Sequence, residues 1–375
     1  MELLLFLSEN NFFVEDLSGC FSSILDKHFV LSTCKQINTK NDFLSSCESA
    51  KVIYVIRIHE DVCADNLFSL PAGWIEEARE LCWEKETIGV NYSIIKFVNN
   101  PTCRKNISVI ISTYNQPLWL EKTLWGYSKQ SISDFELIIA DDGSSKDTYL
   151  MLQRLAPDLP FLIKHVWHED VGFRKCDILN KAILSSQADY LLFSDGDCIP
   201  RKDFVESHAL FRTEGRFLSG GYHKLDRMLS DIITKYDIVT ERCFDLKWLK
   251  SNGMKNSFRN NKLTAKGIIR LALNTLTPTK PTWNGHNSSG WRSDILAVNG
   301  FDERMKYGGQ DREFGERLVN YGVRGKQIRY TAICLHLDHP RNYRTRKSIE
   351  FNNKLRKVTR LNKNIITQFG IVKYL

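Results

Sequence analysis

Apolar and polar positions follow a regular order along the chain from residue 107 onwards. Short apolar runs that fit buried strands occupy residues 107–111, 135–140, 161–165 and 190–193. Segments with helical spacing stand between them and cover residues 118–127, the stretch that ends at Leu155, and residues 176–184. Strands that alternate with helices predict right-handed crossovers and a parallel sheet whose functional loops share one edge. The pattern therefore predicts the α/β class, with a mostly parallel, Rossmann-like sheet flanked by helices.

The fourth run, Tyr190 to Phe193, leads into two acids that stand two residues apart, Asp195 and Asp197. In open α/β sheets, ligands bind beyond the carboxyl ends of the strands, so these carboxylates lie where a site is expected. With Gly196 between them, both can turn oxygen atoms toward one hard divalent cation, and such a cation can hold a diphosphate. A solvated Asp-Gly turn is the alternative explanation of this motif taken alone.

Three parts of the chain differ in pattern. Residues 1–104 alternate apolar runs at 3–7, 29–32 and 51–58 with polar connections, and they add a helical pattern at 74–83. They contain no chemical motif and predict an accessory N-terminal α/β region that ends near Asn99-Asn100-Pro101. Residues 105–340 form the main predicted domain, and residues 341–375 form a basic, helical C-terminal tail.

The composition, 42% hydrophobic and 26% charged over 375 residues, is that of a folded soluble protein. Ten cysteines occur without a CxxC pair, and no basic segment followed by an apolar one stands at Met1. We therefore expect a cytoplasmic protein with reduced thiols. No uncharged apolar run reaches the roughly 18 residues of a membrane span, so any membrane contact is expected to be peripheral.

The formal net charge of +8 is concentrated near the C-terminus, because the chain has nine Lys or Arg residues and one acid between Arg341 and Lys363. An anionic lipid surface, a nucleic acid or an acidic substrate could bind such a tail. A solvated basic helix face is the alternative. Residues 256–276 also interleave basic and apolar side chains, which fits either a helix that touches a membrane or ordinary helical packing.

Four motifs occur in the order in which one enzyme family has them: ISVIISTYN, FELIIADDGSS, SDGDCIP and YGGQDREFGERL. On these motifs, the segment from residue 107 to about residue 340 resembles a family 2 glycosyltransferase of the GT-A fold. The stretch HVWHEDVGFRKCDILNKAI is similar to the bacterial O-antigen and capsule polysaccharide subgroup, in which a β-linked hexose is added to a lipid-carried sugar.

The resemblance implies an inverting, metal-dependent enzyme that moves a hexose from a UDP-sugar to a hydroxyl group of a saccharide acceptor. UDP-Glc, UDP-Gal and an N-acetylated relative are the expected donors. Expected acceptors include saccharides linked to polyprenyl diphosphate, with peripheral contact at the cytoplasmic face of the inner membrane.

The resemblance also implies which residues contact the nucleotide sugar: Thr113, Tyr114, Asn115, Asp142, Arg174, Asp195, Gly196 and Trp291. An aromatic ring such as Tyr114 can stack on uracil, and a carboxylate such as Asp142 can accept the ring N–H. Arg174 suits bidentate phosphate contact, and Lys175 is its less favoured substitute. Trp291 can stack on a sugar face or belong to the core.

A bound Mn²⁺ or Mg²⁺ is the cofactor that the resemblance implies. In the family the second acid of the motif, here Asp197, coordinates the metal directly, and the first, here Asp195, faces the ribose or a metal-bound water. A histidine after a later strand serves as a third ligand in related enzymes. His336 is the first choice for this role and His339 the second, because imidazole binds Mn²⁺ alongside carboxylates.

Asp311 is the residue to which the resemblance assigns the role of general base. It follows Gly308, Gly309 and Gln310, and it would accept the proton of the acceptor hydroxyl as that oxygen attacks the anomeric carbon. A single displacement of this kind inverts the anomeric centre. The family usually has Glu where this chain has Gln310. The alternative is that Asp311 caps a helix over residues 312–321.

Two other functions fit part of the pattern. A nucleotide-sugar pyrophosphorylase of the same fold would need a Gly-rich loop with Lys or Arg after the first strand, and STYNQPLWL lacks it. A nucleotide-sugar-binding module without catalysis would keep the donor residues and make no use of Asp311. No nucleic acid is expected as a partner.

Overall fold

The computed structural model describes the course of the chain for residues 2–7, 52–59, 74–84 and 90–99, and the chain with its side chains for residues 106–339 and 345–373. Two compact units follow each other along the chain, Met1–Arg104 and Lys105–Leu375. Residues 345–373, expected as a separate tail, are therefore grouped with the main sheet. Among the described residues, no helix combines the length and the apolar character that a membrane span requires.

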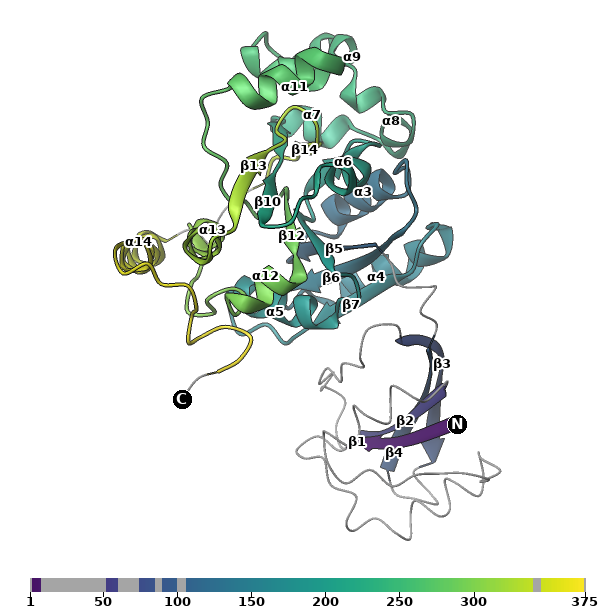
Figure 1. Cartoon of the computed structure of the whole chain (residues 1–375). Helices are drawn as coiled ribbons and strands as arrows, with labels where there is room; N and C mark the ends of the chain where they lie inside the picture. Colours follow the sequence, from purple (N-terminus) through teal and green to yellow (C-terminus); the bar gives the residue numbers. More distant parts are fainter. Residues whose placement is uncertain are drawn as a thin grey trace. The chain divides into compact units, whose positions relative to one another are not determined.

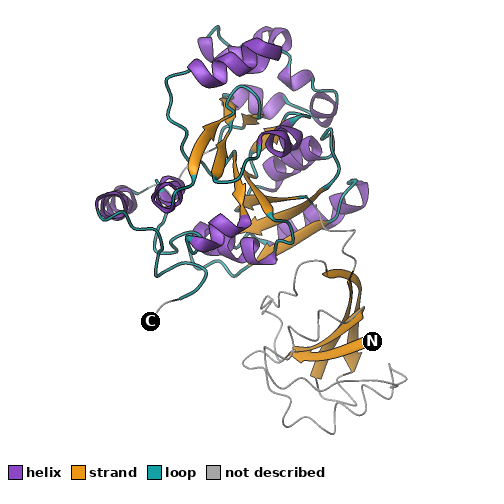
Figure 2. Cartoon of the chain, in the orientation of Figure 1, coloured by secondary structure: helices purple, strands orange, loops and turns teal. Residues whose placement is uncertain are grey.

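The first unit contains a four-stranded sheet with the order β1-β2-β4-β3 (Figure 2). Its strands are β1 (Glu2–Leu7), β2 (Val52–His59), β3 (Trp74–Glu84) and β4 (Val90–Asn99). β1 pairs with β2 in parallel, and the other two pairs are antiparallel. The apolar runs at 3–7 and 51–58 lie largely in β1 and β2, whereas the run at 29–32 lies outside the described residues.

The helix expected at residues 74–83 is wrong, because this segment is strand β3. Its sequence, WIEEARELCWE, is rich in Glu, Ala, Arg and Leu, which favour helices where only local propensity counts. In the structure, β3 instead pairs with β4 from Trp74 to Glu84, with a register shift between Glu76 and Ala78. Pairing along the whole strand overrides the weak local preference. The described elements of this unit are therefore all strands.

The second unit is organised around a seven-stranded sheet with the order β13-β10-β12-β8-β5-β6-β7 (Figure 1). Its strands are β5 (Ile107–Thr113), β6 (Phe135–Asp141), β7 (Ile163–Trp167), β8 (Tyr190–Asp195), β10 (Arg216–Ser219), β12 (Ser288–Trp291) and β13 (Arg324–Gln327). β8, β5, β6 and β7 are parallel neighbours, β12 is antiparallel to β8 and β10, and β13 is parallel to β10. All strands of this sheet except β12 therefore share one direction, and the expected mostly parallel α/β sheet is confirmed.

Helices cover both faces of this sheet, as expected for parallel strands that are apolar on both sides. One core cluster joins β5 and β6 to α3 (Pro117–Tyr127), α4 (Lys146–Leu155) and α6 (Phe204–Phe211). The other cluster joins the opposite face to α5 (Lys175–Ser185), α12 (Arg292–Ala297) and α13 (Gln310–Tyr321). Val109 and Ile110 belong to different clusters because successive strand residues point to opposite faces.

The second unit also has a three-stranded sheet with the order β11-β14-β9. Its strands are β9 (Cys198–Pro200), β11 (Gly221–Lys224) and β14 (Ile333–His336). A third core cluster packs it against α7 (Arg227–Ile232), α8 (Lys235–Val239) and α9 (Leu246–Ser251). The shorter elements are α10 (Asn261–Thr264), α11 (Gly267–Leu276) and 3-10 turns at Ala156–Asp158, Arg242–Phe244 and Phe258–Asn260. Because Cys198 pairs with His336, the end of β14 lies next to the acids that follow β8.

Helix α14 (Arg346–Leu361) packs against α13 (Figure 1). Arg356 Nη2 lies 2.6 Å from Glu316 Oε1, so part of the basic charge of this segment is neutralised inside the unit. The buried side chain of Asn352 donates to the carbonyl oxygens of Lys306 and Gly308, at 2.7 and 2.9 Å. α14 therefore supports the loop that leads into α13.

Candidate active site

Three strand ends meet at the carboxyl edge of the main sheet. Thr113 of β5 pairs with Asp141 of β6, and Ser112 of β5 pairs with Asp195 of β8. A cavity of about 490 Å³ lies at this edge. Its lining comprises Ser112, Thr113, Tyr114, Gln116, Asp142, Gly172, Phe173, Lys175, Asp195, Gly196, Asp197, His286, Tyr307, Gln310, Asp311, His336 and His339. The structure therefore brings Asp195 at the end of β8, Asp197 just after it and Asp311 of α13 into one cavity.

Asp195 is held by two donors that converge on the same oxygen. Lys175 Nζ and Ser112 Oγ each lie 2.7 Å from Asp195 Oδ1. Burial by itself would raise the pKa of Asp195, but the ammonium of Lys175 and the neighbouring His286 hold that pKa well below its usual value. Burial likewise opposes the charge on Lys175, yet Asp195 and Asp311 raise its pKa above the usual value. The cavity therefore contains an ion pair that persists at neutral pH.

Asp197 faces two histidines at the end of β14. Asp197 Oδ2 lies 3.9 Å from His336 Nε2 and 2.9 Å from His339 Nε2. His336 Nδ1 lies 2.9 Å from the carbonyl oxygen of Leu337, which can only accept, so the neutral ring carries its proton on Nδ1 and its lone pair on Nε2. Burial opposes ionisation of Asp197, but the two histidines lower its pKa. A carboxylate and an imidazole lone pair thus face each other across a short gap.

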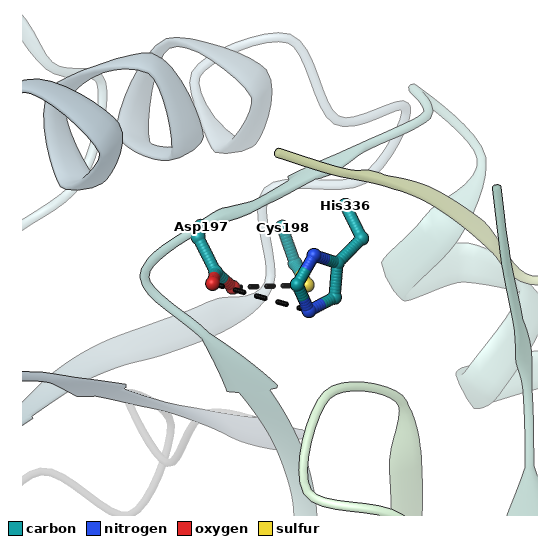
Figure 3. Close-up of side chains that lie close together, drawn as sticks. All are labelled: Asp197, Cys198 and His336. Atoms are coloured by element: carbon teal, nitrogen blue, oxygen red, sulfur yellow. Dashed lines mark hydrogen bonds and ion pairs between the residues drawn. The ribbon is translucent and has the colours of Figure 1, made fainter. Parts of the chain in front are cut away.

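Cys198 lies beside these two side chains, as Figure 3 shows. One ligand atom from each of Asp197, Cys198 and His336 lies within 4.8 Å of the others. Cys198 belongs to the apolar core, however, and burial raises the pKa of its thiol well above the usual value. A neutral thiol is a poor ligand for a hard cation, whereas carboxylates suit both Mn²⁺ and Mg²⁺ and imidazole also suits Mn²⁺. The donor set that fits a divalent cation is therefore Asp197 with His336, and Asp195 stands two residues away.

Asp311 enters the cavity from the first turn of α13. Gly308 and Gly309 precede it with φ angles of 106° and 92°, a left-handed conformation that favours glycine. The side chain of Gln310 accepts a hydrogen bond from the Gly308 N–H at 2.9 Å and so braces this loop. Asp311 Oδ1 is buried and has no hydrogen-bond partner among the described residues, and burial raises the pKa of the carboxyl. A carboxyl group with one unpartnered oxygen and a raised pKa is suited to accept a proton.

Thr113, Tyr114 and Asp142 line the same cavity at the ends of β5 and β6. Tyr114 is 42% exposed, and its hydroxyl donates to Asp170 Oδ2 at 2.8 Å. Thr113 Oγ1 is buried without a partner in the described part of the chain. Asp142 Oδ1 lies 2.8 Å from His168 Nε2. An exposed aromatic ring beside a hydroxyl and a carboxylate suits a planar, polar ligand such as a nucleobase.

Residues 108–221 match the family model described as Glycosyl transferase family 2. This segment is a family 2 glycosyltransferase domain. It contains the ends of β5, β6 and β8 with Asp195 and Asp197, whereas Asp311 and His336 come from later parts of the chain. The candidate site is therefore assembled from the family segment and from two elements that lie beyond it.

Several curated proteins that are similar to this chain come from bacteria. The chain is 25% identical to an uncharacterized glycosyltransferase, YfnE, of Bacillus subtilis, over 65% of this chain and 68% of that protein. It is 27% identical to a chondroitin synthase of Pasteurella multocida, over 84% of this chain and 34% of that protein. It is 25% identical to a validoxylamine A glucosyltransferase of Streptomyces hygroscopicus, over 58% of this chain and 52% of that protein. The chain thus spans about a third of the chondroitin synthase and about half of the glucosyltransferase.

Two solved structures show distant similarity. TarS 1–349 of S. aureus in complex with UDP-GlcNAc is 15% identical, with 70% of this chain and 71% of that chain covered and a TM-score of 0.47. The mannosyltransferase PcManGT of Pyrobaculum calidifontis, in complex with GDP-Man and Mn²⁺, is 16% identical, with 70% and 63% covered and a TM-score of 0.43.

Of the residues expected at the nucleotide sugar, Asn115, Arg174 and Trp291 do not line the cavity, and the first two lie in the loops after β5 and before α5. Asn115 connects the loops after β5 and β6, since its side-chain oxygen accepts from the Ser145 N–H at 2.8 Å. Arg174 precedes α5, and its backbone N–H donates to Asp142 Oδ2 at 3.0 Å, while its guanidinium pairs with Asp177. In the structure both residues brace the wall of the site.

Trp291, expected to stack on the donor sugar, lies away from the cavity of the glycosyltransferase. β12 runs antiparallel to β8, so its last residue, Trp291, pairs with Tyr190 at the start of β8, while Asp195 stands at the other end of that strand. The indole packs edge-on against Tyr190, and its Nε1–H donates to the carbonyl oxygen of Thr213 at 3.1 Å. The expected sugar contact is thus corrected to a structural role, because strand direction places this ring at the amino edge.

Two basic residues of the cavity were not chosen from the sequence. Lys175, considered only as a substitute for Arg174, is the cation that contacts Asp195. His286 lies in the loop before β12, which the antiparallel direction of that strand brings to the carboxyl edge beside Asp195. Burial lowers the pKa of His286 to about 4, so its imidazole is neutral at pH 7. The motif GFRKC contained the signal for a cation, but its pattern did not say which of the two side chains turns inward.

Proposed function

We propose that this chain is an inverting, metal-dependent glycosyltransferase that moves a hexose from a UDP-sugar to a hydroxyl group of a saccharide. The observation that carries the proposal is the convergence of Asp195, Asp197 and Asp311 on one cavity, although the last is more than a hundred residues away in sequence. UDP-Glc, UDP-Gal and an N-acetylated relative are the proposed donors. The uracil ring is assigned to Tyr114, Thr113 and Asp142.

A divalent cation, Mn²⁺ or Mg²⁺, is assigned to Asp197 and His336, with Asp195 as a further carboxylate. Asp197 Oδ2 and His336 Nε2 lie 3.9 Å apart, and these two side chains would hold such an ion together. When bound, such a cation stabilises the negative charge that grows on a departing diphosphate. His339 Nε2 contacts the same carboxylate oxygen and is the second candidate ligand. Lys175 would add a fixed positive charge beside the same phosphates through its contact with Asp195.

Asp311 is assigned the role of general base. Its unpaired Oδ1 would accept the proton of the acceptor hydroxyl while the acceptor oxygen forms its bond to the anomeric carbon and the bond to the diphosphate breaks. One displacement inverts the configuration, so an α-linked UDP-hexose gives a β-glycoside. Burial raises the pKa of this carboxyl, which makes it a stronger base than an exposed aspartate.

The biological setting that we propose is the synthesis of a surface polysaccharide, such as O-antigen or capsule. Two of the relatives are named as polysaccharide synthases, the chondroitin synthase and a hyaluronan synthase of Pasteurella multocida. A further relative, from Campylobacter jejuni, is named as a glucosyltransferase that acts on a diphosphate-undecaprenol saccharide. These names support an oligosaccharide acceptor, including one linked to polyprenyl diphosphate.

We also propose peripheral contact with the cytoplasmic face of the inner membrane through α11. This helix exposes Ile268, Ile269 and Leu276, at 82, 64 and 76%, and Lys266 and Lys280 flank it. Apolar side chains flanked by lysines fit an anionic lipid surface. The protein should co-sediment with vesicles that contain phosphatidylglycerol, and a double change of Ile268 and Ile269 to Ser should release it. Equal sedimentation of both forms would refute this contact.

The test of the main proposal is a screen of UDP-sugars for the release of UDP, with and without added Mn²⁺ and with saccharide acceptors. The change Asp311→Asn should lower kcat by about 100- to 10,000-fold, because it removes the base, and it should leave UDP binding in place. Asp147→Asn, at an exposed position on α4, is the matched control and should retain full activity.

The competing functions give different results in the same screen. A binding module would bind UDP-sugars without turnover, and Asp311→Asn would change nothing measurable. A pyrophosphorylase would consume the nucleotide sugar with pyrophosphate and form UTP. UDP release that is unaffected by Asp311→Asn or by removal of divalent cations with EDTA would overturn the proposed mechanism.

A further inference from the structure

A second, larger cavity meets the catalytic one. It has a volume of about 850 Å³ and is formed by β11, the start of α7, the segment 253–262 and the first turn of α13. His286 lines both cavities. Two successive residues of α13 line different cavities, because Asp311 lines the first cavity and Arg312 lines the second. A ligand in the second cavity would therefore lie within reach of the proposed base.

The lining of this cavity is strongly basic. Seven of its side chains are cationic, namely Lys224, Arg227, Lys255, Arg259, Lys262, Arg312 and Arg329, and two are acidic, namely Asp226 and Asp338. Lys224 pairs with Asp338 at 3.1 Å, and Asp226 caps α7 by accepting from the Leu229 N–H. Arg227 pairs with Asp231 outside the lining. The other five cations have no carboxylate within 4.0 Å in the described part of the chain.

The positive charges in this cavity repel one another. Burial, together with the neighbouring Arg329 and Arg259, lowers the pKa of Lys262 to about 8. Its ammonium donates to the Tyr222 carbonyl oxygen at 2.9 Å, a neutral acceptor that does not compensate the charge. Like charges gathered in a partly buried space destabilise the folded chain unless an anion binds there. The arrangement therefore indicates a negatively charged ligand.

The same cavity also has unused neutral hydrogen-bonding groups. His223 and Asn260 are 7% and 5% exposed, and their Nδ1 and Oδ1 atoms have no partner among the described residues. Asn284, which also lines the cavity, has an unpartnered Oδ1 as well. Buried polar groups are normally paired, so such atoms point to a ligand with hydroxyl groups. Tyr222 adds an aromatic ring, whose centroid lies 4.5 Å from that of His286.

We propose that this cavity binds the acceptor, and that the acceptor is a saccharide with a negatively charged group close to the hydroxyl that is glycosylated. The inference rests on the proposed glycosyltransferase function. Arg259, Lys262 and Arg329 bind the anionic group, which is a carboxylate of an acidic sugar or a phosphate that links the sugar to its carrier. The sugar lies against Tyr222 and His286, and its reactive hydroxyl points toward Asp311.

The experiment compares three acceptors of similar size: a neutral oligosaccharide, one that ends in a uronic acid, and one that ends in a sugar phosphate or diphosphate. The wild-type protein should have a higher kcat/KM with at least one of the two anionic acceptors than with the neutral one. Whichever anionic acceptor is preferred identifies the carboxylate or the phosphate as the recognised group. In the double variant R259Q/K262Q the ratio of anionic to neutral kcat/KM should fall about 10- to 100-fold, because two charge-assisted contacts are lost.

The matched control is K129Q/K146Q, which removes two exposed cations at other sites and should keep the wild-type ratio. Thermal unfolding and UDP binding identify variants that are correctly folded. Equal use of neutral and anionic acceptors by the wild type, or an unchanged ratio in R259Q/K262Q, would overturn the inference while transfer itself continues. Failure of the proposed function is a different result, namely no sugar transfer to any acceptor. In that case calorimetric binding of the anionic saccharides to the wild type and to R259Q/K262Q decides whether the cavity recognises them.

Discussion

Lys175 gives the sharpest test of how this site is built, because the sequence favoured its neighbour Arg174. The change Lys175→Met removes the ammonium that lies 2.7 Å from Asp195 Oδ1 and keeps the length of the side chain. The side chains of Lys175 and Asp195 are 18% and 23% exposed, so water screens their interaction in part. A hydrogen bond to a charged group contributes about 1.5–3 kcal/mol, and we expect a loss of about 1–2 kcal/mol in the free energy of unfolding.

The pH range of this effect follows from the directions of the two pKa shifts. The pKa of Asp195 is lowered in the folded state, so its contribution is complete above about pH 4 and disappears as the pH falls below that value. The pKa of Lys175 is raised, so its contribution is complete up to about pH 10 and disappears above it. Urea denaturation of the wild type and of Lys175→Met should therefore differ at pH 7 and converge as the pH falls well below 4.

The effect of Lys175→Met on catalysis should be larger than the effect on stability. The variant lacks a fixed cation next to the acids that are proposed to face the diphosphate, and loss of one such preorganised charge lowers kcat by about 100-fold or more. Arg174→Met is the matched control, because the guanidinium of Arg174 pairs only with Asp177 among the described residues and should change kcat/KM less than about threefold. Normal activity of Lys175→Met together with a tenfold loss in Arg174→Met would refute this account of the site.

Three further changes test other parts of the structure. Arg317→Met leaves the buried carboxylate of Glu313 without its cation, although Thr359 Oγ1 still donates to it, and should lower the free energy of unfolding by about 3–5 kcal/mol, measured by urea denaturation. Asn352→Ala removes two hydrogen bonds to the loop before α13 and should lower kcat about tenfold with little change in UDP affinity; equal kinetics would exclude a positioning role for α14. Trp291→Ala should lower the melting temperature and leave the KM for the donor unchanged. A raised KM would instead support the sugar contact that was expected from the sequence.

The sequence by itself determined four of the seven strands of the main sheet, the helices between them and the edge at which chemistry was expected. The apolar runs at 107–111, 135–140 and 190–193 form β5, β6 and β8. A strand that is buried on both faces of a parallel sheet is recognisable as a short apolar segment between polar residues. Since parallel strands end at one edge, Thr113, Tyr114, Asp142 and Asp197 could be grouped from the sequence, and they do line one cavity.

Only the tertiary structure decided the rest, because it depends on pairing between distant segments. β3 is a strand because its backbone pairs with β4, and the helix propensity of its own residues does not predict this pairing. The antiparallel direction of β12 places His286 in the site and Trp291 at the opposite edge of the sheet. Successive residues of a helix point about 100° apart, so the choice between Arg174 and Lys175 depends on how the start of α5 is oriented against the sheet. The basic cavity beside Asp311 likewise exists only because β11, α10 and α13 meet there, although their charges are far apart in the sequence.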